Sequence, residues 1–210
     1  MEGVDCQIAD DGEIIVRGEL VMQGYWNNPK APSETIKDGW LHTGDIGMFD
    51  TDGYLRITDR KKDIIVNSGG DNISPQRIEG MLTAQPEIGQ AMVYGDKRPH
   101  LVALIIPDAE FAATWAKEQG HSEQSLEFVI EHQDFKAVIN EAVVRVGNDL
   151  SVIERIRRFT MANEAFTIDN EMLTPTLKIR RHVIQKKYGE KLEALYGCLL
   201  YTSEAADEKR

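Results

Sequence analysis

Cysteine is scarce in this sequence of 210 residues. The two cysteines, Cys6 and Cys198, lie near opposite ends of the chain and lack metal-ligand spacing. Their positions exclude a cysteine-based metal site and a disulfide framework of the kind that stabilises small secreted domains. The sequence therefore favours a reducing, intracellular setting.

Long apolar runs and a surplus of positive charge are also missing. No apolar run approaches the roughly 20 residues that a membrane-spanning helix requires, and residues 1–5 (MEGVD) lack an apolar targeting segment. The formal net charge is −11. This charge argues against a nucleic-acid partner, because phosphate binding requires a basic face. We interpret the charge as an acidic surface.

The composition that remains is that of an ordinary globular protein, with 41% hydrophobic and 28% charged residues. Residues 59–63 (DRKKD) form a charged run between two apolar, β-prone segments. Such a run is not expected in a core, so we interpret it as a solvated connection between two bodies. The sequence predicts an α+β protein with four parts: a β-rich body at 1–58, a connection at 59–62, an α+β body at 63–197 and an unassigned tail at 198–210.

Local patterns predict the elements of both bodies. In the first body, alternation of apolar and polar residues predicts short strands at 6–8, 13–17, 19–22 and 55–58. In the second body, apolar residues at helical spacing and capping residues predict helices at 75–85, 108–120, 135–146 and 183–196. Apolar runs there predict strands at 64–66, 89–94, 101–106 and 158–162. His121 and His132 lie in polar stretches, and we expect no partners for them.

Two stretches carry specific motifs. Residues 40–45 (WLHTGD) and 57–75 (ITDRKKDIIVNSGGDNISP) together resemble the adenylate-forming (AMP-binding) synthetases, which include acyl-CoA synthetases, luciferases and peptide-synthetase adenylation domains. The resemblance covers nearly all of residues 1–197. It implies that residues 1–58 are the end of a large N-terminal domain and that residues 63–197 are a small, mobile C-terminal domain.

The same resemblance implies roles for three charged residues. Asp45 would accept hydrogen bonds from the ribose hydroxyls of ATP or the adenylate, because a carboxylate can bind both hydroxyls with charge-assisted bonds. Arg60 would contact the ribose and the phosphates, and Lys62 would be the hinge about which the small domain rotates. From the residues alone, positions 43–45 (TGD) also fit a simple turn, and we interpret Lys61 as a solvated charge.

Residues 173–181 (LTPTLKIRR) resemble the loop that carries one catalytic lysine in this family, which makes Lys178 the candidate. The family commonly has a glycine directly before that lysine, whereas this sequence has Leu177, a version typical of long-chain fatty acyl-CoA synthetases. An ammonium ion can bridge the substrate carboxylate and the α-phosphate and neutralise the charge that develops there. The alternative from the residues alone is a surface lysine in a basic stretch that also contains Arg180, Arg181, Lys186 and Lys187.

Small residues at Ser68, Gly69 and Gly70 would face the pantetheine arm of coenzyme A. A backbone without Cβ leaves room for a thin ligand and allows positive φ. The cofactors that the resemblance implies are therefore ATP or AMP, coenzyme A and Mg²⁺. We expect no metal ligands in this chain, because the family's magnesium motif is not found in it.

The implied function is that of the C-terminal part of a long-chain fatty acid–CoA ligase, which converts fatty acid, ATP and coenzyme A into acyl-CoA, AMP and pyrophosphate. The family's glycine-rich phosphate loop and acyl pocket are not found in this sequence, so we expect no activity from the chain alone. Two alternatives stay open: a fragment of another adenylating enzyme, such as a peptide-synthetase adenylation domain, and a non-catalytic adenylate-binding module. We expect a cytoplasmic location and leave open a peripheral membrane contact of the full-length parent through regions outside this sequence.

Overall fold

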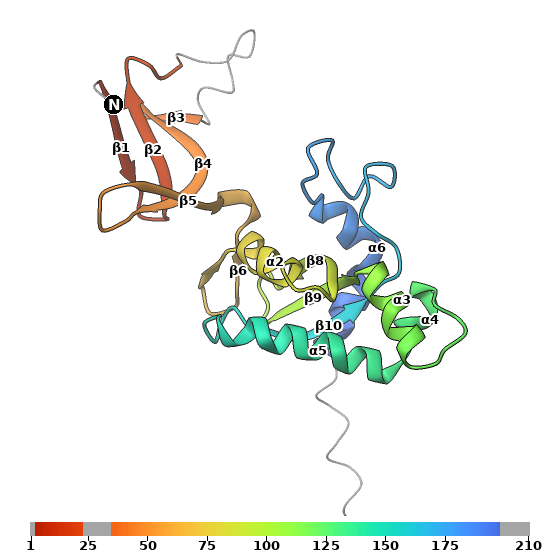
Figure 1. Cartoon of the computed structure of the whole chain (residues 1–210). Coiled ribbons are helices and arrows are strands. Elements are labelled where there is room, and N and C mark those ends of the chain that lie inside the picture. The colour runs from red at the N-terminus through yellow and green to blue at the C-terminus, as the bar shows by residue number, and fades with distance from the viewer. Residues whose placement is uncertain (1–2, 23–34, 198–210) are drawn as a thin grey trace, which may run out of the picture. The chain divides into compact units, whose positions relative to one another are not determined.

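The computed structural model describes residues 3–22 and 35–197 of the chain. The chain divides into two compact units, Met1–Ile64 and Ile65–Arg210 (Figure 1). The first described unit is built mainly of strands and the second of helices and strands, so the predicted α+β class is confirmed. The tail predicted at 198–210 lies outside the described residues.

The first unit contains one antiparallel sheet. Its strands are β1 Val4–Ile8, β2 Glu13–Gly18, β3 Ile36–Lys37, β4 Trp40–Phe49 and β5 Leu55–Arg60. The long strand β4 pairs with β2 along one edge, and β3 and β5 pair with different parts of β4. Turns around residues 9–12 and 50–54 join β1 to β2 and β4 to β5 as hairpins, and they set the register of the sheet.

Residues 19–22 do not form the predicted strand. Strand β2 ends at Gly18, where φ is +148° and the chain passes so close to Gly3 that an added Cβ would lie 2.1 Å from the Gly3 carbonyl oxygen. The Val21 N–H then donates to the Gly18 carbonyl (3.1 Å) and closes a turn. The glycine that the sequence places before this segment ends the strand, and the alternation beyond it has no structural meaning.

The charged run at 59–63 is exposed at residues 60–62, but its first residue, Asp59, is buried, contrary to expectation. Strand β5 continues to Arg60, which places Asp59 opposite Ile46 within the sheet, and Asp59 is only 4% exposed. The Arg60 N–H donates to Asp59 Oδ1 (2.6 Å). A 3₁₀ turn, η1 Lys61–Asp63, follows directly. The run therefore belongs to the first unit, and the boundary of the units lies between Ile64 and Ile65.

The second unit combines a hairpin, a three-stranded sheet and five helices in its described part. Its strands are β6 Ile65–Val66, β7 Asn72–Ile73, β8 Ile88–Tyr94, β9 Leu101–Pro107 and β10 Ile156–Met161. Its helices are α2 Pro75–Thr83, α3 Ala109–Glu118, α4 Leu126–Val129, α5 Gln133–Asn148 and α6 Arg181–Ala194. Ser74 and Asp108 cap α2 and α3 by accepting the N–H groups of Arg77 and Phe111, as the sequence predicts.

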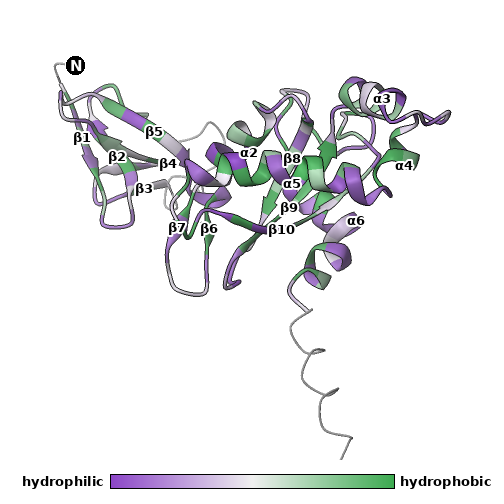
Figure 2. Ribbon diagram, turned by 60° about the horizontal axis from the view of Figure 1, so that its bottom comes forward, coloured by the Kyte–Doolittle hydropathy of each residue, from purple (hydrophilic) through white to green (hydrophobic). Residues whose placement is uncertain are grey.

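Strand β9 is the centre of this unit. It pairs antiparallel with β8 and parallel with β10, and all seven of its residues are buried. A strand covered on both faces is expected to be apolar throughout, and Figure 2 shows hydrophobic residues concentrated along β8 and β9. The sheet therefore separates two layers of helices and loops.

The two faces of β9 serve two cores. Leu101, Ala103 and Ile105 pack with helices α2, α3 and α5, whereas the alternate residues at 102, 104 and 106 pack with α6 and the loop before it (Figure 1). Each large apolar side chain buried in this way contributes about 1.5–3 kcal/mol. In the described residues, no helix is long and apolar enough to cross a membrane.

Candidate functional site

The two predicted nucleotide-binding residues lie next to each other in the first unit. Asp45 and Arg60 are cross-strand partners in β4 and β5. Their side chains form an ion pair with 2.7 Å between Arg60 Nε and Asp45 Oδ1, and the two side chains are 49% and 25% exposed, respectively. A carboxylate and a guanidinium are thus presented together at the sheet surface, where they can bind hydroxyl and phosphate groups.

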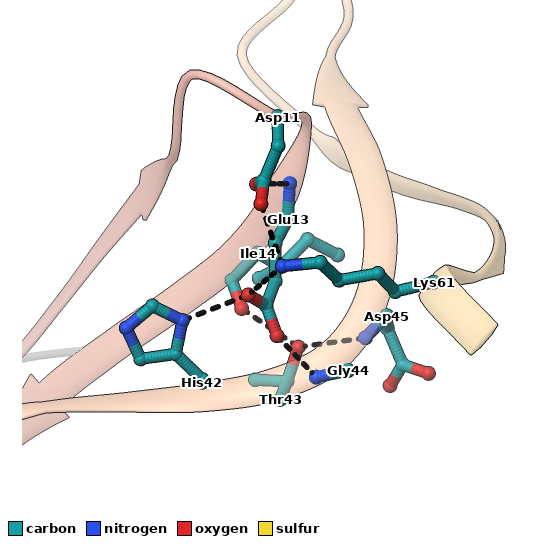
Figure 3. A network of polar contacts seen from close by, with 8 residues as sticks. All are labelled: Asp11, Glu13, Ile14, His42, Thr43, Gly44, Asp45 and Lys61. Carbon is teal, nitrogen blue, oxygen red and sulfur yellow. Dashed lines mark hydrogen bonds and ion pairs between the residues drawn. The ribbon is translucent and has the colours of Figure 1, made fainter. Parts of the chain in front are cut away.

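A buried carboxylate that the sequence pattern did not reveal, Glu13, binds the residues next to this pair in the chain, Gly44 and Lys61. Glu13, at the start of β2, is 3% exposed. Its Oε1 accepts the Gly44 N–H (2.8 Å), and its Oε2 lies 2.7 Å from His42 Nδ1 and 3.0 Å from Lys61 Nζ (Figure 3). Burial alone would raise the pKa of Glu13, but the bonds from His42, Lys61 and Gly44 outweigh it and lower that pKa below its ordinary value.

Lys61 is exposed, as the sequence suggested, but it also has charged partners that the sequence did not reveal. Its ammonium group lies 2.6 Å from Asp11 Oδ2 and 3.0 Å from Glu13 Oε2. The hydrogen bonds to Asp11 and Glu13 raise the pKa of Lys61, and the bond from Lys61 lowers the pKa of Asp11. The 3₁₀ turn that follows β5 thus returns Lys61 to the β1–β2 turn, a partner 50 residues away that local pattern cannot reveal.

The motif around Asp45 is a distorted strand and not a simple turn. The Thr43 hydroxyl donates to the Ile14 carbonyl (2.7 Å) and accepts the Asp45 N–H (3.1 Å), while Gly44 has a φ of +73° (Figure 3). The positive φ favours glycine at this position. The motif residues 42–44 are therefore held by β2, and they fix the backbone from which the Asp45 side chain extends.

Lys62, the predicted hinge, is an exposed residue of η1, two residues before the boundary of the units. Arg60 and Ile64, on either side of η1, have extended backbone conformations, with ψ of 131° and 137°. The position agrees with a chain segment between two units. The hinge role itself stays a prediction.

The Ser68–Gly69–Gly70 stretch forms the tip of the β6–β7 hairpin in the second unit. Asn67 Oδ1 accepts the N–H groups of Gly69 and Asp71 (both 2.9 Å), and Gly70 has a φ of +87°. The Ser68 N–H donates to the Arg98 carbonyl (3.0 Å). All three residues of the stretch are exposed. The expected backbone freedom is present, while the role in binding coenzyme A stays a prediction.

Lys178 lies on a second hairpin of the same unit, between the paired residues Leu173 and Ile179. The Thr174 N–H donates to the Lys178 carbonyl (2.8 Å), and the Lys178 N–H donates to Thr174 Oγ1 (3.0 Å). The Lys178 side chain is exposed and forms no ion pair within residues 3–22 and 35–197. In that part of the chain, no hydrogen bond joins this hairpin to the Ser68–Gly70 tip.

Arg181 is not part of a basic surface stretch, although the sequence suggested it. Its guanidinium binds both carboxylate oxygens of Glu79 (2.7 Å each) and donates to the Val93 carbonyl (3.2 Å). The two side chains are only 18% and 8% exposed. The Val93 N–H also donates to Glu79 Oε1 (2.7 Å). This buried pair fixes the end of the Lys178 hairpin to α2 and β8, and the sequence signal was an acidic residue inside the apolar face of α2.

Two histidines that were expected to lack partners contact aromatic rings instead. The rings of His121 and His132 lie 4.5 Å apart, and each is within about 6 Å of Trp115. The expectation was wrong because α3, α4 and α5 bring residues from three helix ends together. No group of three or more His, Cys, Asp or Glu residues with the geometry of a metal site occurs in the described chain.

Comparison with known proteins is informative for both units. A family model described as the AMP-binding enzyme C-terminal domain matches residues 62–199. The chain is 42% identical over 196 residues to long-chain-fatty-acid–CoA ligase FadD15 of Mycobacterium tuberculosis, covering 93% of this chain and 33% of that protein. It is 37% identical over 193 residues to human long-chain-fatty-acid–CoA ligase 1, covering 90% of this chain and 28% of that protein.

Among solved structures, the chain resembles the A-PCP didomain of a carboxylic acid reductase from Segniliparus rugosus in complex with AMP. The TM-score is 0.70 at 25% identity, covering 88% of this chain and 24% of that chain. The chain therefore spans about a third or less of the length of the proteins that it matches.

Proposed function

The chain belongs to the AMP-binding, adenylate-forming enzymes, and from this premise we propose that it is the C-terminal part of a long-chain fatty acid–CoA ligase. The observation that carries the proposal is the extent of the similarity. It runs over 93% of the chain, and so over both units, in a relative that is named for this activity. The substrates of the complete enzyme are fatty acid, ATP and coenzyme A, and its location is cytoplasmic.

The first half-reaction joins a fatty acid carboxylate to the α-phosphorus of ATP and releases pyrophosphate. Asp45 accepts the ribose hydroxyls, and Arg60, already paired with Asp45 at 2.7 Å, contacts the ribose and phosphates. Lys178 places its ammonium between the carboxylate and the α-phosphate, where negative charge is shared in the transition state. Mg²⁺ would supply further charge neutralisation when bound, and we expect its ligands in the part of the enzyme outside this sequence.

The second half-reaction forms the bond between the coenzyme A sulfur and the acyl carbonyl carbon and breaks the bond from that carbon to the AMP oxygen. The second unit rotates about Lys62 between the two half-reactions. This rotation withdraws Lys178 and brings the Ser68–Gly70 tip to the pantetheine arm. The tip suits a thin ligand because its two glycines have no side chains and its backbone is fixed by Asn67.

The test uses a chimeric enzyme, in which this chain replaces the matching third of the M. tuberculosis ligase. The chimera should release pyrophosphate with ATP, magnesium and palmitate. Lys178→Ala should reduce this rate by about 10²–10³, whereas Lys186→Ala, a matched exposed lysine of α6, should have little effect. Conversion of preformed palmitoyl-adenylate to palmitoyl-CoA should survive the Lys178→Ala change.

Gly69→Leu is the reciprocal variant. It adds a side chain at the tip and should slow conversion of palmitoyl-adenylate to the thioester while pyrophosphate release continues. Gly189→Leu is its control. Like Gly69, Gly189 has no positive φ, and an added Cβ at Gly189 meets no atom within 4 Å. Equal slowing of both half-reactions by Lys178→Ala, or loss of adenylation first in Gly69→Leu, would refute the division of roles between the two hairpins.

A further inference from the structure

The Ser68–Gly70 tip contacts the turn that joins β8 to β9, at residues 95–100. Three hydrogen bonds link this turn to the β6–β7 hairpin: the Lys97 N–H donates to the Val66 carbonyl (2.8 Å), the Val66 N–H to Asp96 Oδ1 (3.2 Å), and the Ser68 N–H to the Arg98 carbonyl (3.0 Å). Strands β6 and β7 themselves pair over only two residues each, and so short a hairpin is weak by itself. The position of the tip therefore depends on the 95–100 turn.

Glu193, near the end of α6, binds Tyr94, directly before this turn, and Arg98, within it. One of its carboxylate oxygens accepts the Tyr94 hydroxyl, and the other binds the Arg98 guanidinium. The hydrogen bonds from Tyr94 and Arg98 outweigh burial and lower the pKa of Glu193 below its ordinary value, so the carboxylate is ionised at neutral pH. Both of its oxygens are then acceptors, which suits a hydroxyl and a guanidinium donor together.

Tyr196, just after α6, belongs to the same network. Its hydroxyl oxygen lies 3.0 Å from the His100 carbonyl oxygen and 3.3 Å from the Tyr94 carbonyl oxygen, at the two ends of the turn. The Arg98 guanidinium lies 5.3 Å from the Tyr196 ring centroid, a cation–π distance. The Arg98 and Glu193 side chains are 41% and 38% exposed, and an ion pair so exposed contributes little when it is isolated. The two tyrosines make it part of a network with one defined geometry.

The Lys178 hairpin is fixed by different groups. Its end is bound through the guanidinium of Arg181, which contacts both carboxylate oxygens of Glu79 in α2 (2.7 Å each). The two proposed binding elements of the second unit therefore have separate supports. A change at Glu193 should displace the tip and leave Lys178 where it is.

We propose that Glu193 is a positioning residue for the thioester-forming half-reaction. It acts on the Ser68–Gly70 tip through the 95–100 turn and does not itself contact coenzyme A. The inference rests on the proposed function and deepens it. By fixing the turn, Glu193 fixes the backbone along which the pantetheine arm passes, and so orients the thiol toward the acyl carbonyl carbon.

The first experiment measures the two half-reactions in the chimeric enzyme described above. With preformed palmitoyl-adenylate, Glu193→Ala should lower kcat/KM for coenzyme A about ten- to a hundredfold, because a displaced tip no longer orients the thiol. Pyrophosphate release with ATP, magnesium and palmitate should stay within about twofold. Glu193→Gln keeps one acceptor oxygen but no charge, and its effect should lie between those of glutamate and alanine. Glu190→Ala, which removes an exposed carboxylate of the same helix, should change neither half-reaction.

The second experiment measures amide hydrogen exchange in the chain alone. The Ser68 and Lys97 N–H groups both donate across the contact between the tip and the turn. Glu193→Ala should speed their exchange about threefold or more, because the contact opens more often. Exchange in β9 and in the Lys178 hairpin should be unchanged.

Equal slowing of both half-reactions, or faster exchange throughout the second unit, would contradict the proposal, since Glu193 would then stabilise the unit as a whole. Unchanged thioester formation, or unchanged exchange at Ser68, would contradict it as well. If the unchanged chimera formed no thioester from palmitoyl-adenylate, the proposed function itself would fail. That result is distinguishable, because the exchange at Ser68 is measured without the reaction.

Discussion

The charged residues of the first unit and those of the Lys178 hairpin are held in opposite ways. Around Glu13, each charge has a nearby partner: the carboxylate is buried and contacts His42, Gly44 and Lys61. At Lys178 the ammonium is exposed, and the fixed charges lie three residues later, where Arg181 binds Glu79. The first arrangement fixes a side chain in place, whereas the second fixes only the base of a hairpin.

This difference fits the two proposed tasks. A residue that binds the nucleotide through both half-reactions benefits from a rigid backbone, and Asp45 has one because its neighbours are bonded to β2. A cation that must engage one intermediate and then withdraw should not have a permanent partner in its own domain, because that partner would compete with the substrate. The comparison predicts large stability effects at Glu79–Arg181 and Glu13, and almost none at Lys178.

The largest effect is expected at the buried pair of the second unit. Arg181→Met leaves the Glu79 carboxylate buried without its cation, which typically costs about 3–5 kcal/mol of unfolding free energy. The measurement is urea unfolding followed by amide hydrogen exchange, read separately in the two units. Arg77→Met is the control, because Arg77 pairs with Glu154 at 2.5 Å but is 50% exposed, and its loss should cost about 1 kcal/mol or less. Similar losses of unfolding free energy in both variants would contradict the stabilising role of the buried Arg181–Glu79 pair.

A smaller effect is expected at Glu13, the buried carboxylate of the first unit that contacts His42, Gly44 and Lys61. Glu13→Gln keeps the shape of the side chain but points an amide donor toward groups that are themselves donors, and should cost the first unit about 1–3 kcal/mol. Exchange in the second unit should stay unchanged. The control is Asp5→Asn, which weakens an exposed pair with Arg17 (2.9 Å) and should cost about 0.5 kcal/mol or less. An equal loss of unfolding free energy in the two variants would contradict a structural role for the contacts of Glu13.

Local patterns in the sequence were sufficient for much of the fold. The caps at Ser74 and Asp108, the β8–β9 hairpin and the amphipathic helix α5 all depend on residues close together in the chain. The motif residues Asp45 and Arg60 could also be identified, and the structure shows them in contact. The strand at 19–22 failed because a single glycine overrode the alternation.

The partners that hold the site could not be predicted from the sequence. Lys61 and Glu13 are 48 residues apart, and Arg181 and Glu79 are 102 residues apart. Whether a lysine in a charged run has an ion-pair partner depends on the fold, which decides what lies opposite it. The same is true of the His121–His132 contact, and of the backbone conformation of Leu177 (φ of +59°), which follows from the pairing of Thr174 with Lys178.

The stability of the first unit should also depend on pH through Glu13. In the folded state the pKa of Glu13 lies below its ordinary value of 4.5, so the folded state binds fewer protons than the unfolded state in that range. The corresponding stability is fully present above about pH 4.5 and is lost as the pH falls below it. Hydrogen exchange between pH 6 and pH 3 should show this loss in the first unit. Glu13→Gln should remove part of it, and a dependence unchanged by the substitution would contradict the role of Glu13.

The smallest effect separates two exposed lysines, Lys61 and Lys178. Lys61→Ala removes a cation from two carboxylates, one of them buried, and should cost the first unit about 1 kcal/mol, since the ammonium is partly exposed. Lys178→Ala should change the stability of the second unit by about 0.5 kcal/mol or less, because the bonds of its backbone to Thr174 do not involve the side chain. Hydrogen exchange of both variants, compared with the unchanged chain, gives the two values in one experiment. If Lys178→Ala destabilised its unit as much as Lys61→Ala does, the ammonium of Lys178 would have a partner within the folded chain. The second unit would then have to break that contact before the lysine could bind a substrate.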